Sequence, residues 1–97
     1  MTFGDLPLHD AVLSAIHISW QAARCDLIVQ PVGTTEHVLA FEGFTVLEFP
    51  KEEPWGPSSS INVVREPQRG CFEIELQSGD VLKVQAQQWS YRSEALQ

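Results

Sequence analysis

Cysteine and histidine are both scarce in this chain. Cys25 and Cys71 are the only thiols among 97 residues, too few for a disulfide scaffold or a cysteine-based zinc site. The three histidines are isolated in sequence, with no pair at the short spacing that metal ligands require. No glycine-rich phosphate loop is present either. We therefore expect two reduced thiols, no metal site and no cofactor.

Long apolar runs and positive charge are the next features in short supply. No apolar run approaches the ~20 residues of a membrane-spanning helix, and residues 1–5 do not resemble a signal peptide. We therefore expect a cytoplasmic protein that does not enter membranes. Six basic residues stand against thirteen acidic ones, for a net charge of −7. Because phosphate binding needs a basic surface, this charge argues against nucleic acid as a partner and is compatible with a basic protein. It also serves solubility.

Helical periodicity is absent as well. Apolar residues recur at every second position, and no helical pattern of ten or more residues occurs. Roughly six or seven short strands, with turn signals about every 8–12 residues, predict an all-β fold. We expect one domain over residues 1–97, built as a small antiparallel sandwich or a partly open barrel.

The first predicted hairpin joins strands at residues 12–20 and 25–31. A four-residue loop at 21–24 would pair Trp20 with Cys25 and Ile18 with Leu27, on one apolar face. Trp20 is therefore predicted to lie in the core. Ser14 interrupts the apolar face of the first strand, which predicts an irregularity there.

The middle of the chain gives weaker signals. A strand is predicted at residues 37–42, ended by a bend at Gly43. Residues 44–49 fit either a strand or a single helical turn. A short strand at 61–65 is followed by a predicted loop at 66–70.

The clearest hairpin covers residues 71–86. A three-residue loop at 77–79 sets Ile74 across from Leu82 and Phe72 across from Val84, which places Lys83 on the exposed face. Such loops favour a left-handed residue at their third position, and Gly79 stands there. Beyond it, Trp89 is predicted to extend the last strand, and residues 93–97 to fray.

Residues 52–62 contain Pro54, Trp55, Gly56 and Pro57. The two prolines restrict the backbone, so this segment is predicted to be a rigid connection. Ordering an indole in so stiff a frame favours burial of its ring. We expect Trp55 to close one end of the β core, with a binding surface as the alternative.

Residues that carry chemistry are few and scattered. His9 and Asp10 could form a catalytic or metal pair, although a turn cap is the more ordinary role of Asp10. The serines at 58–60 lack the Gly-x-Ser-x-Gly elbow of a nucleophile, and Glu73 and Glu75 share a solvated face. No catalytic residue is therefore assigned. The candidate binding residues are His9, Asp10, Trp55, Ser58, Asn62 and Trp89.

Several of these motifs together suggest a family. The His9-Asp10-Ala11 opening, the Pro54-Trp55-Gly56-Pro57-Ser58 loop and the 75–80 turn resemble a group of small uncharacterised bacterial domains. The opening is also similar to that of some all-β immunity proteins of bacterial toxin systems. This resemblance implies a protein-binding function. Together with the acidic charge and the lack of assembled catalytic motifs, it leads us to expect a non-enzymatic domain that binds or inhibits a basic protein. The alternative is a small-ligand or enzymatic domain with a pocket near Trp55, His9 and Asp10.

Overall fold

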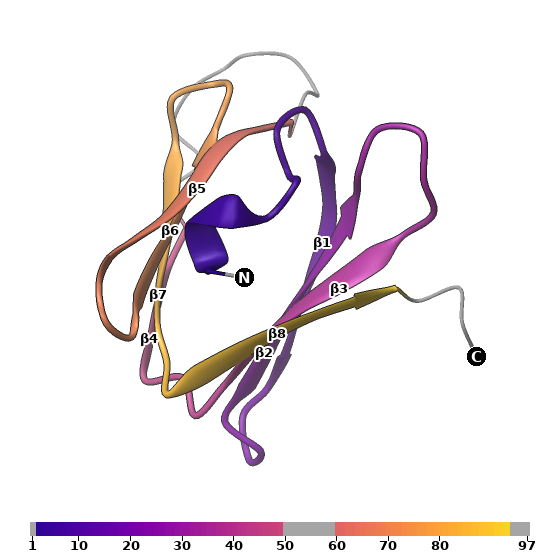
Figure 1. The fold of residues 1–97 in the computed structure, drawn as a ribbon. Helices are drawn as coiled ribbons and strands as arrows, with labels where there is room; N and C mark the ends of the chain where they lie inside the picture. The colour runs from indigo at the N-terminus through magenta and orange to yellow at the C-terminus, as the bar shows by residue number, and fades with distance from the viewer. Residues whose placement is uncertain (1, 50–59, 94–97) are drawn as a thin grey trace.

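The protein folds as two antiparallel sheets that pack face to face without closing into a barrel (Figure 1). This computed structural model describes residues 2–49 and 60–93. Sheet A has the strand order β1-β2-β3-β8, and sheet B the order β4-β7-β6-β5. The described elements are η1 (Phe3–Asp5, a 3₁₀ helix), β1 (Val12–Ser19), β2 (Arg24–Gln30), β3 (His37–Glu42), β4 (Val46–Glu48), β5 (Ile61–Gln68), β6 (Cys71–Leu76), β7 (Val81–Gln85) and β8 (Gln88–Ser93). The all-β prediction is confirmed, and the ambiguous residues 44–49 contain a strand.

The core fills the space between the sheets, because the strands alternate apolar and polar residues. The largest fully buried side chains include Phe41, Leu27 and Leu39 from sheet A, with Phe72, Ile74 and Leu82 from sheet B. The amino-terminal segment contributes as well: Phe3, Leu6, Leu8 and Ala11 are all buried. Sequence periodicity did not reveal this contribution, because the segment is neither helical nor extended throughout.

The β6–β7 hairpin confirms its predicted register. Ile74 lies opposite Leu82, Phe72 opposite Val84, and Glu73 opposite Lys83. Leu76 and Asp80 close the three-residue loop, since the Leu76 amide donates to the Asp80 carbonyl at 2.8 Å. Gly79 has φ of +102°, the left-handed conformation that the loop requires.

The β1–β2 hairpin differs from its prediction in register and in the fate of Trp20. Its loop is four residues long, as expected, but it begins at Trp20, so Ile18 pairs with Cys25 and Ile16 with Leu27. The expected irregularity at Ser14 is confirmed as a register shift between Leu13 and Ala15. Trp20 is 85% exposed, so its predicted burial is wrong. The loop removes this residue from the strand and therefore from the core face.

Strand β5 is longer than predicted, and β8 is a separate strand rather than an extension of β7. The loop expected at 66–70 is confirmed only at residues 69–70. Its first part is wrong, because β5 continues to Gln68, with a register shift after Arg65 that accommodates Pro67 on this edge strand. The tail does not prolong β7. It crosses to sheet A, where β8 pairs with β3 and sets Trp89 opposite Phe41. The prediction for Trp55 lies outside the described residues, as does most of the expected frayed tail.

Candidate functional site

Three of the six candidate residues come together where the amino-terminal segment meets the start of β5. His9 Nδ1 lies 2.8 Å from the carbonyl oxygen of Asn62. Because a carbonyl can only accept, Nδ1 carries the proton in this contact. Asp10 adopts φ of +68°, and its backbone amide donates to the carbonyl of Ile61 at 2.8 Å. The cluster therefore anchors residues 9–10 to β5.

The carboxylate of Asp10 faces a different partner from the one expected of a turn cap. It accepts a hydrogen bond from the side chain of Gln77, at the β6–β7 loop. His9 Nε2 lies 3.7 Å from the same carboxyl group, and both side chains are more than half exposed. The contacts of His9 and Asp10 thus join three separate parts of the chain, which is a structural role on an open surface.

Asn62 extends this cluster along the outer face of sheet B. Its side-chain amide donates to Glu75 at 2.9 Å. Arg65 donates to Glu73 at 2.7 Å and to Glu75 at 3.2 Å. The hydrogen bonds from Asn62 and then Arg65 lower the pKa of the Glu75 carboxyl group. Glu75 is therefore a stabilised anion rather than a group prepared to exchange protons near neutral pH.

Trp89 does not join this cluster. It lies on β8 and packs edge-on against Phe3, with ring centroids 5.4 Å apart. Its half-buried ring belongs to the margin of the core. Ser58 and Trp55 lie outside the described residues, so the structure brings together His9, Asp10 and Asn62 and separates Trp89 from them.

The two cysteines differ in environment. Cys25 is fully buried, and this burial raises the pKa of its thiol to about 11. Such a thiol stays protonated near neutral pH and is a poor nucleophile. Cys71 is half-buried, and both thiols are free. Within the described ranges, no three His, Cys, Asp or Glu residues gather as metal ligands would.

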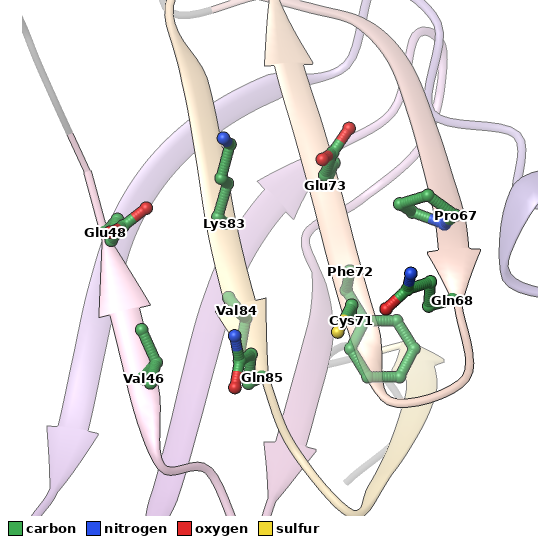
Figure 2. A pocket seen from close by; sticks show the side chains of 10 residues that line it. All are labelled: Val46, Glu48, Pro67, Gln68, Cys71, Phe72, Glu73, Lys83, Val84 and Gln85. Atoms are coloured by element: carbon green, nitrogen blue, oxygen red, sulfur yellow. The ribbon is translucent and has the colours of Figure 1, made fainter.

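A hollow of about 330 Å³ lies on the outer face of sheet B (Figure 2). Two cross-strand rows of side chains line much of it. The charged row runs Glu48, Lys83, Glu73, and the uncharged row runs Val46, Gln85, Cys71. Charges alternate along the first row, as in ordinary solvated sheet surfaces. The volume is at the small end of ligand sites, which span roughly 300–1,000 Å³.

The most exposed large apolar side chain of the described residues is Trp20, which sequence reasoning placed in the core. Its loop closes through the amide of Ala23, which donates to the Trp20 carbonyl at 3.2 Å. Ala23 itself has φ of +50°. The bulge at Ser14 lets Leu13 serve as a core residue, but it leaves the alternation of Ile16, Ile18 and Trp20 unchanged, so no sequence signal marks the end of the strand before Trp20.

Comparisons with known proteins found no family model, no curated protein and no solved structure that matches this chain. No helix in the described ranges is long and apolar enough to cross a bilayer.

Proposed function

We propose that this chain is a non-enzymatic, cytoplasmic binding domain that contacts a basic protein through the tip of its β1–β2 hairpin. An inhibitor of the immunity-protein type would be one example of such a domain. The observation that carries the proposal is the 85% exposure of Trp20.

A solvent-exposed tryptophan is unusual in a loop. Its indole could remove about 150–250 Å² of surface from water, and tryptophan is enriched among residues that dominate binding energy. Single exposed apolar residues are common, but Trp20 has a neighbour of the same kind: Ile18 is 51% exposed. The hairpin tip also extends beyond the rest of the fold, at the bottom of Figure 1. A projecting apolar tip fits a pocket on a protein surface.

Charges beside the tip favour a basic partner. Arg24 is the first residue after the loop. Its Nε lies 2.8 Å from Oδ1 of Asp26, and its Nη1 lies 3.6 Å from Oε1 of Glu42. One cation among two anions leaves this cluster net negative, in keeping with the total charge of −7. Complementary charge of this kind speeds association and selects partners more than it adds affinity.

The experiment begins with affinity capture from the source cell, followed by measurement with the purified partner. Trp20→Ala should weaken binding by roughly 30-fold or more, the effect of losing a residue worth about 2 kcal/mol. Val32→Ala is the matched control, because Val32 is 72% exposed at the opposite end of β2. Equal loss in both variants, or no loss in Trp20→Ala, would show that the tip is not the contact surface.

Salt provides the second test. The association rate should fall as salt rises from ~50 to ~500 mM, because the Debye length shortens to a few ångströms. An association rate that does not change with salt would show that the acidic surface serves solubility alone. The alternative of a pocket near Trp55, His9 and Asp10 has less support, since His9 and Asp10 already bond to Asn62 and Gln77.

A further inference from the structure

The four edge strands of the two sheets differ in how they are protected against pairing with another chain. Exposed edges are usually blunted by short length, charge or proline. In sheet B, β4 has three residues and includes Glu48, whereas β5 carries Arg65, Glu66 and Pro67. In sheet A, β8 carries Arg92. Only β1, with the sequence VLSAIHIS, contains no charged residue and no proline among these described edge strands.

Part of the β1 edge is already used by its own chain. Val12 forms a bridge with Ser60, and the bulge at Ser14 follows. Beyond the bulge, residues 15–19 pair with β2 on one side, and no described strand lies on the other. In this stretch His17, Ile18 and Ser19 are exposed. Within the described part of the chain, these five residues of strand edge are therefore open to a further strand.

The side chains of this stretch are arranged symmetrically about His17. Ile16 and Ile18 flank it, and the small residues Ala15 and Ser19 lie outside them. An antiparallel strand of the same sequence, centred on His17, would set Ile16 against Ile18 of the second copy. It would likewise set Ala15 against Ser19 of the second copy. Both isoleucines would gain an apolar cross-strand neighbour on the same face.

We propose that two copies of this chain associate by antiparallel pairing of their β1 strands about His17. The contact is isologous, as in most two-fold dimers, and it joins the two A sheets into one eight-stranded sheet. We call residues 15–19 of the two paired strands the seam. A second copy fits this edge better than a basic partner does, because the seam contains no Asp, Glu, Lys or Arg. The tips bearing Trp20 lie at opposite ends of the seam, so each stays clear of its centre.

Salt separates this association from the binding proposed above. Two molecules of charge −7 repel each other, so raising salt should strengthen self-association, whereas it should weaken binding to a basic partner. Sedimentation equilibrium of the purified chain from ~10 μM to ~1 mM, which spans weak to moderate affinities, should show a monomer–dimer equilibrium that shifts toward dimer with salt.

His17→Lys tests the seam directly. It places two ammonium groups near each other at the two-fold axis, while within one chain the new cation faces Asp26, the cross-strand partner of position 17. Folding should therefore be unharmed, and the dimer dissociation constant should rise at least tenfold, about 1.4 kcal/mol. Gln30→Lys is the matched control, because Gln30 is exposed on β2 of the same sheet and outside the seam. It should dimerise as the original chain does.

Amide hydrogen exchange gives an independent measurement. As the dimer forms, amides in residues 15–19 should become protected, whereas those of β8, the other edge of sheet A, should not. A chain that stays monomeric over the whole range would overturn the proposal. So would a His17→Lys variant that dimerises normally, or a dimer without protection at 15–19. Partner binding through Trp20 should survive His17→Lys, so either proposal can fail alone.

Discussion

The ring of Phe3 packs edge-on against the ring of Phe72, with centroids 4.9 Å apart. Phe3 also contacts Phe41 at 5.9 Å and Trp89 at 5.4 Å, so one side chain of the amino-terminal segment touches both sheets. The 3₁₀ turn that carries it is held by Thr2, whose hydroxyl donates to Asp5 at 2.7 Å. The amino-terminal segment is therefore part of the core rather than an appendage.

Phe3→Ala should lower the free energy of unfolding by about 3–5 kcal/mol, because it removes a buried aromatic ring and leaves a cavity between the sheets. Urea denaturation measures this loss. Phe49→Ala is the control: Phe49 is 41% exposed, so its removal should cost much less. Similar losses in the two variants would show that Phe3 is not the junction of the two sheets.

Gly79→Ala should destabilise the protein by about 1 kcal/mol. A Cβ at this position would meet no atom within 4 Å, so the cost arises from φ of +102° alone. Gly4→Ala provides the contrast, because Gly4 has no positive φ and its Cβ would meet only the Val64 carbonyl, at 3.8 Å. Thermal unfolding of the two variants should separate them; equal melting temperatures would contradict the strained loop.

These elements show why part of the fold could be predicted. The β6–β7 hairpin follows from strict alternation on both strands and a glycine where the loop needs one. The β1–β2 register was wrong by two positions because its loop, with Ala23 in a left-handed conformation, carries no glycine to mark it. Strand β8 was not foreseen as a separate strand because its choice of sheet depends on contacts with β3, distant in sequence.

The candidate site was predictable only as separate pieces. His9 and Asp10 attract attention as an adjacent pair, and Asn62 as a polar residue at a strand start. Their meeting depends on the backbone contacts of Asp10 and Ala11 with Ile61, at 2.8 and 2.7 Å. No periodicity in the sequence encodes those contacts. Trp20 was wrongly predicted to lie in the core because no glycine marks the β1–β2 loop, in which it lies.

The thiols should differ in reactivity. Near pH 8, a thiol reagent should label Cys71 in the folded protein and both cysteines after unfolding, because burial raises the pKa of the Cys25 thiol to about 11. An unfolded thiol ionises near pH ~8.5. Between these two values the unfolded state binds fewer protons, so stability should fall as pH rises. Cys25→Ala should lose this part of the pH dependence, and rapid labelling of Cys25 in the folded protein would contradict its burial.

The described tryptophans offer a direct comparison of a surface role with a structural one. Trp20→Ala should leave the melting temperature nearly unchanged, because an 85% exposed ring makes few contacts. Trp89→Ala should lower it clearly, since that ring packs against Phe3 at the margin of the core.

Acrylamide quenching of tryptophan fluorescence is a complementary measurement. The emission lost in Trp20→Ala should be the readily quenched part, and the emission lost in Trp89→Ala should be the more protected part. A marked loss of stability in Trp20→Ala would indicate that Trp20 packs in the core, and the basis for the proposed contact surface would then be lost. Unchanged stability in Trp20→Ala together with lost partner binding is the result that the hairpin tip predicts.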